Sequence, residues 1–126
     1  MNLDFCSLFS GSTGNSELVA FDDTLLLIDA GRTGKALDEA VRRQGFDMRM
    51  VRAILVTHEH IDHVRALGTL QKKHAVPLYA SSGTAAALDY PAPYLHAFAA
   101  DETFTIKDLQ IRSFRTSHDA KESVGY

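Results

Sequence analysis

The segment Leu55–Val64, LVTHEHIDHV, gathers side chains that could bind metal ions. It contains Asp62 and three of the six histidines of the chain, His58, His60 and His63. His58, His60 and Asp62 are spaced by two, so in an extended loop their side chains point the same way. His63 begins a turn into a helix and can reach a different point. The spacing favours two adjacent metal ions, one held by the first two histidines and the other by Asp62 and His63.

The elements around the cluster favour a ligand group over an accidentally polar turn. The apolar run Arg52–Thr57 predicts a buried strand before it. Val64, Leu67 and Leu70 have helical spacing and predict a helix that runs to about His74. A site between a buried strand and a helix is where α/β folds place functional groups. Imidazole and carboxylate ligands suit zinc, with manganese or iron as alternatives.

The remaining elements predict a layered α/β fold. Strands are predicted at Leu3–Phe9, Glu17–Phe21, Thr24–Asp29, Pro77–Ala80, Thr103–Ile106 and Leu109–Thr116. Helices are predicted at Gly34–Gln44 and Ser82–Leu88, and Pro91 and Pro93 break the chain after the second. Because strands outnumber helices and the helices come singly, a helical bundle is disfavoured. The 126 residues are enough for one domain with a core.

Composition narrows the choice of partners and compartment. A formal net charge of −3 gives no strong electrostatic footprint for nucleic acid. Four basic residues are interpreted as solvated helix surface: Arg42, Arg43, Lys72 and Lys73. One cysteine excludes an internal disulfide and fits a reducing compartment. The sequence shows no secretory signal and no apolar stretch of membrane-spanning length. We therefore expect a cytoplasmic protein with no membrane partner.

Three stretches resemble motifs of the metallo-β-lactamase superfamily. THEHIDH (residues 57–63) resembles its HxHxDH signature, LLLIDAG (Leu25–Gly31) its first motif and RTSHDAKESVGY its third. The resemblance implies a four-layered αββα sandwich with metals at the sheet edge. Within the superfamily, SLFSGSTGNS and TSHDAKESVGY are most similar to the YycJ/WalJ group. These are bacterial cytoplasmic proteins regarded as metal-dependent, exonuclease-like hydrolases.

The same resemblance implies roles for individual residues. His118 would complete the metal position of His58 and His60, leaving a fourth place for a water whose pKa zinc lowers to about 7. Asp29 would brace the metal loop without binding metal, the alternative being a simple turn residue at a strand end. Asp119 could brace a ligand in the same way or be a turn residue.

Two further roles concern the reaction. Asp62 could accept a proton during hydrolysis in addition to binding metal. The loop Ser10–Ser16, SGSTGNS, could bring backbone N–H groups near a substrate phosphate, with Ser12 and Asn15 as candidate substrate contacts. A plain hairpin turn is the alternative interpretation of this loop.

The resemblance also implies an incomplete site. The superfamily adds a bridging aspartate and a late histidine after its third motif, but this sequence ends at Tyr126, eight residues past His118. We therefore expect residues 1–126 to be one incomplete domain, the N-terminal half of the sandwich. Such a chain should bind at most one metal tightly and hydrolyse weakly or not at all. Its bare sheet face should drive self-association.

Three functions remain open. The first is a dinuclear hydrolase acting on a phosphodiester, with the ends of single-stranded DNA as the substrate. The second keeps the metals but acts on a thioester or lactone, as glyoxalase-like relatives do. The third is an inactive metal-binding fragment. A β-lactam substrate is disfavoured by the lack of a signal peptide, and an oxygen-reductase site by His60, since those sites resemble HxExDH.

Overall fold

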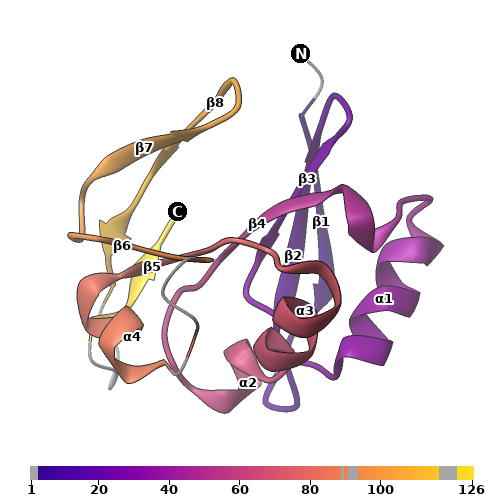
Figure 1. Cartoon of the computed structure of the whole chain (residues 1–126), viewed down its shortest axis with the longest axis horizontal. Helices are drawn as coiled ribbons and strands as arrows, with labels where there is room; N and C mark the ends of the chain where they lie inside the picture. The colour runs from indigo at the N-terminus through magenta and orange to yellow at the C-terminus, as the bar shows by residue number, and fades with distance from the viewer. Residues whose placement is uncertain (1–2, 89, 91–93, 117–121) are drawn as a thin grey trace.

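The computed structural model describes residues 3–88, 90, 94–116 and 122–126, and in this part of the chain a six-stranded sheet forms the centre (Figure 1). The spatial order of the strands is their order along the chain. Pairings among the first three strands are antiparallel, and those from the third to the sixth are parallel. The strands are β1 (Leu3–Phe9), β2 (Ser16–Phe21), β3 (Thr24–Ile28), β4 (Val51–Leu55), β5 (Leu78–Ser81) and β6 (Leu95–Phe98).

The helices lie in the connections between the parallel strands, because such strands need crossovers. They are α1 (Gly34–Arg43), the 3₁₀ turn η1 (Met48–Met50), α2 (Ile61–Val64), α3 (Leu67–His74) and α4 (Ser82–Ala87). The larger core lies between them and one face of the sheet, where Leu37 and Val41 of α1 and Leu70 of α3 are buried. In Figure 1, α1 and α3 lie side by side against β1–β4.

The opposite face of the sheet is covered by a β-hairpin, β7 (Thr103–Ile106) and β8 (Leu109–Arg112). Ile106 and Ile111 of this hairpin pack on Leu26 and Leu55 in a second, smaller core. Two short strands, β9 (Phe114–Arg115) and β10 (Val124–Gly125), pair beside it. The mixed, layered α/β class predicted from the sequence is therefore confirmed.

Two predicted boundaries are wrong, and each has a local cause. The single helix expected from Val64 to His74 is two helices, because the Ala66 N–H donates to Ala30 O instead of continuing the first one (2.9 Å). The strand expected at Leu109–Thr116 is interrupted at Ser113, whose N–H donates to Glu102 O (3.0 Å).

Two strands were not predicted at all: β10, which pairs antiparallel with β9, and β6, which pairs parallel with β5. In β6, His96 and Ala97 are both exposed, so its sequence lacks the alternation of apolar and polar residues that predicts a strand. Only its pairing with β5 reveals it as a strand. Pro91 and Pro93 lie outside the described residues. No helix among the described residues is long and apolar enough to cross a membrane.

Candidate metal centre

The histidine cluster lies where β3 and β4 end. These neighbouring strands are parallel, so their carboxyl ends meet at one edge of the sheet. Asp29 follows β3 directly, and its N–H donates to Leu55 O, the last residue of β4 (2.8 Å). Thr57 and His58 follow β4 after one residue. The topology thus brings two loops together that are about 30 residues apart in the sequence.

Asp29 is a buried carboxylate whose hydrogen bonds hold the second loop. Its side chain accepts from the Thr57 N–H (2.8 Å), from Thr57 Oγ1 (2.7 Å) and from His63 Nδ1 (2.5 Å). Only 4% of the residue is exposed, so these donors satisfy a group that would otherwise be costly to bury. Its backbone is left-handed (φ +66°), a conformation that aspartate adopts more readily than most residues. This geometry supports a bracing role better than a simple turn.

The Asp29 and Thr57 contacts also select the tautomers of two histidines. A carboxylate only accepts, so the neutral His63 ring must carry its proton on Nδ1. The single hydroxyl proton of Thr57 goes to Asp29, so Oγ1 accepts from His58 Nδ1 at 3.0 Å. In both rings the lone pair is then on Nε2, so this is the nitrogen with which each ring could bind a metal.

Asn15 and Asp62 lie against His63 on its other side. The Asp62 Oδ2 and His63 Nε2 atoms are 3.5 Å apart. Asn15 Nδ2 lies 3.2 Å from Asp62 Oδ2 and 3.3 Å from His63 Nε2. The Asn15 backbone N–H donates to Asp62 O (2.7 Å). The loop Ser10–Ser16 is thereby attached to the predicted metal ligands.

The three imidazole rings form one compact group. The ring centroid of His58 is 4.8 Å from that of His60 and 3.9 Å from that of His63. His58 is buried, whereas His60 and His63 are half-buried. Within the described part of the chain, no group of three or more His, Cys, Asp or Glu side chains is placed to hold a metal ion.

The charges around His63 favour its protonated form. Burial lowers the pKa of His63, but the hydrogen bond and charge of Asp29, with the charges of Asp62 and Glu17, outweigh it and raise the pKa overall. Burial and the charge of Asp29 raise the pKa of Glu17, which the charge of His63 partly offsets. Because a metal ligand must give up its proton, acid should weaken metal binding here.

The remaining predicted residues have different positions. Ser12 lies exposed in the loop after β1. His118 and Asp119 lie outside the described residues. Thr57, which the sequence did not single out, proves central to the hydrogen bonding of the site. Its only sequence signal was its position immediately before the HxHxDH motif.

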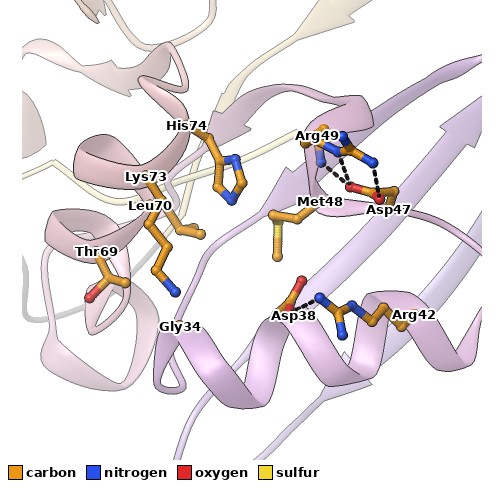
Figure 2. A pocket seen from close by; sticks show the side chains of 10 residues that line it. All are labelled: Gly34, Asp38, Arg42, Asp47, Met48, Arg49, Thr69, Leu70, Lys73 and His74. Atoms are coloured by element: carbon orange, nitrogen blue, oxygen red, sulfur yellow. Dashed lines mark hydrogen bonds and ion pairs between the residues drawn. The ribbon is translucent and has the colours of Figure 1, made fainter.

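A separate cavity of about 310 Å³ lies between α1, η1 and α3 (Figure 2). Lys73 and His74 extend into it from α3, while its two carboxylates are ion-paired. These pairs are Asp38–Arg42 and Asp47–Arg49, each with a shortest N–O distance of 3.0 Å. Because its acidic groups are neutralised by arginines, this cavity resembles a solvated surface cleft more than a metal site.

Comparison with known proteins decides the family. The profile described as "Metallo-beta-lactamase superfamily" matches residues 10–123. The chain belongs to this superfamily. Among its curated superfamily relatives are the exodeoxyribonuclease YycJ of Bacillus anthracis, 39% identical over the whole of this chain, and the exodeoxyribonuclease WalJ of Streptococcus pneumoniae, 37% identical over 90% of it. The chain spans about half the length of these relatives, 50% and 45% respectively.

Solved metallo-β-lactamases share the fold. MEM-A1, a subclass B3 enzyme isolated from a soil metagenome library, has a TM-score of 0.78 and 22% identity, covering 96% of this chain and 55% of its own. The Rm3 metallo-β-lactamase has a TM-score of 0.79 and 21% identity, covering 95% and 54%. At these identities the likeness establishes the fold alone. The predicted extent, about half of a metallo-β-lactamase fold, is confirmed.

Proposed function

We propose that the protein is a metal-dependent hydrolase that acts on nucleic-acid ends. The observation that carries this proposal is the hydrogen bonding of the His58 and His63 Nδ1 atoms to Thr57 and Asp29, which sets each ring in the tautomer that has its lone pair on Nε2, as a metal ligand requires. The proposal concerns the activity of the whole protein, since the chain spans about half the length of its curated relatives.

The donor atoms fit a metal of the size of zinc. Two ligands at about 2.0–2.1 Å from a tetrahedral zinc lie roughly 3.4 Å from each other. Asp62 Oδ2 and His63 Nε2, at 3.5 Å, have this separation. The donor set, imidazole with carboxylate, suits zinc, with manganese or iron as alternatives. When bound, such an ion stabilises charge on a phosphoryl oxygen and activates water near neutral pH.

The ligands divide into two positions in this proposal. His58, His60 and His118 would hold one ion, and Asp62 with His63 would take part in a second position. Val124, six residues after His118, donates its N–H to Thr57 O (2.9 Å), so the chain returns to the cluster. This contact supports His118 as a ligand.

The other residues of the site would orient ligands and move protons. Asp29 holds the His63 ring through Nδ1, and Asp119 is proposed to brace His118 in a similar way. Asp62 would accept a proton from the attacking water. Ser12, exposed in the loop beside the site, is proposed to contact a substrate phosphate.

The names of the relatives favour DNA as the substrate. YycJ and WalJ are exodeoxyribonucleases, so we propose single-stranded DNA ends for this protein too. A thioester or lactone is the second substrate class, because the same donor set would stabilise an acyl oxyanion. Location in the cytoplasm stays a prediction.

The experiment measures nucleotide release from end-labelled single-stranded DNA, with added zinc or manganese, against thioester hydrolysis under the same conditions. Wild-type chain and the His60→Ala and His63→Ala variants are compared, with His96→Ala as the matched control because His96 lies exposed in β6. We expect weak DNA hydrolysis that both site variants abolish and the control retains. Thioester turnover alone would favour the second substrate class, and metal binding without hydrolysis of either substrate would favour an inactive metal-binding chain.

A further inference from the structure

We infer that Asn15 is a positioning residue for the metal ligands Asp62 and His63, and that it does not contact the substrate. This inference rests on the proposed metal site. It adds Asn15 to that site, whereas the sequence alone suggests Asn15 as a substrate contact. Asn15 is half-buried and 47 residues from Asp62 in the sequence, yet its backbone and its side chain both contact the ligand loop.

The backbone of Asn15 joins three loops at one point. Its N–H donates to Asp62 O (2.7 Å), and its carbonyl accepts from the Gly31 N–H (2.9 Å). Gly31 is required at this junction, because a Cβ there would lie 1.8 Å from Asp62 O and 2.6 Å from Asn15 N. The loop after β1, the loop after β3 and the ligand loop are therefore packed backbone against backbone.

Gly11 fixes which way the Asn15 amide points. The Gly11 N–H donates to Asn15 Oδ1 (3.2 Å), and Asn15 Nδ2 donates to Gly11 O (2.9 Å). Turning the amide over would place two donors together and two acceptors together. The amide therefore presents its nitrogen to the ligand loop.

That nitrogen faces the two atoms that a metal would bind. Asn15 Nδ2, Asp62 Oδ2 and His63 Nε2 form a triangle with sides of 3.2, 3.3 and 3.5 Å. An N–H aimed at Nε2 selects the same tautomer that Asp29 selects from Nδ1. The amide thus holds both ligand atoms at the separation of a tetrahedral site in the metal-free protein. On metal binding it would leave Nε2 and keep Asp62 Oδ2, since a carboxylate oxygen has a second lone pair.

The amide has no proton left to donate to a substrate phosphate, whose oxygens accept hydrogen bonds. Both amide protons and Oδ1 are directed at groups of the protein, and the backbone N–H and carbonyl of Asn15 are also bonded. Thr13, in contrast, is exposed in the same loop and has no proposed role in the site. This contrast makes Thr13→Ala the matched control for Asn15→Ala.

The first test needs no metal. In the NMR spectrum of the wild-type, metal-free chain, the side-chain amide protons of Asn15 should exchange slowly with water and show nuclear Overhauser effects to the His63 ring. In Asn15→Ala the His63 Nε2 resonance should shift, while that of His60 stays. Rapid exchange of the Asn15 amide in the wild type would overturn the inference, whatever the protein binds or hydrolyses.

The second test follows zinc titration through the same histidine resonances. Loss of residues that orient metal ligands typically costs ten- to a hundredfold in affinity. We expect Asn15→Ala to weaken zinc binding at the Asp62–His63 position about tenfold and to leave the affinity of the His58–His60 position unchanged. Thr13→Ala should leave the zinc affinity of both positions unchanged. A positioning role would be contradicted if zinc binding were weakened equally at both positions, or if it were not weakened at the Asp62–His63 position. Failure of the wild type to bind zinc would instead count against the proposed function.

Discussion

Thr57 shows how one hydroxyl group can prepare two metal ligands. It donates to Asp29 and accepts from His58, and its backbone N–H donates to the same carboxylate. We predict that Thr57→Val weakens zinc binding about tenfold, because His58 loses the partner that selects its tautomer. Loss of the hydrogen bond should destabilise the fold by only about 1 kcal/mol.

The measurement is zinc affinity by competition with a chelator, together with urea unfolding. Thr57→Ser keeps the hydroxyl and should restore most of the affinity. Thr13→Val, in an exposed position, is the control. If Thr57→Ser binds zinc as poorly as Thr57→Val, the hydroxyl is not the cause.

For individual residues, the sequence predicted which side chains could bind metal, but not which hydrogen bonds orient them. The HxHxDH spacing is local, so His58, His60, Asp62 and His63 could be read from it directly. The contacts of Asn15 join residues 47 and 48 positions apart, and nothing in the local sequence encodes them. For this reason the positioning role that we propose for Asn15 could not be predicted from the sequence, which suggests a substrate contact instead.

The 3₁₀ turn η1 illustrates how a short element is stabilised by the residue that precedes it. Asp47 precedes it and accepts from the Arg49 N–H (2.8 Å) and from its guanidinium (3.0 and 3.1 Å). These hydrogen bonds lower the pKa of Asp47 to about 2 from its ordinary value of 3.8. A lowered pKa means that the contribution to stability is present above pH 3.8 and is lost as the pH falls towards 2.

We predict that Arg49→Gln raises the pKa of Asp47 towards 3.8, measured by an NMR titration of its carboxyl group. The stability difference between wild type and Asp47→Asn should shrink over the same pH range. Arg43→Gln is the control, since Arg43 pairs with Glu39. An Asp47 pKa that does not respond to Arg49→Gln would show that the guanidinium contacts are not formed in solution.

Elements with a strong local pattern were predicted well, and those defined by tertiary contacts were not. The strand Leu3–Phe9 was predicted with its observed bounds, and α1 to within one residue. The break between α2 and α3 depends on the Ala66–Ala30 contact, 36 residues away in the sequence. Similarly, β6 forms because β5 offers a parallel edge.

At the scale of the whole molecule, the face of the sheet that packs against the β7–β8 hairpin also carries an exposed apolar surface. Leu3 and Phe5 of β1 lie opposite Phe21 and Val19 on this side, with 57% and 64% of their surface exposed. We propose that this surface mediates self-association, since an exposed apolar patch on a sheet edge favours contact between copies. Sedimentation of the wild type should then show masses that increase with concentration.

Phe5→Glu should reduce this association, because it places a charge in the patch. Gln44→Glu adds a charge on the exposed surface at the end of α1 and is the matched control. A wild type that sediments as a monomer at high concentration would refute the prediction.

The number of metal ions that one chain binds depends on how many ligands the whole chain supplies. Among the described residues no group of three or more potential ligands is placed to hold a metal ion, and the further ligand that we propose, His118, would belong to the His58–His60 position. We predict at most one tightly bound zinc per chain, measured by elemental analysis after dialysis. His118→Ala should remove it, with His74→Ala as the control. Two tightly bound ions per chain would show that the second position is also complete.

The strand order has a consequence for biosynthesis. Every ladder of the main sheet joins strands that are consecutive along the chain, β1 to β6 without exception among the described residues. A ribosome that releases about 5–20 residues per second therefore delivers each strand when its partner is already outside the exit tunnel. We expect the sheet to grow from its amino-terminal edge during translation, with little need to wait for distant segments.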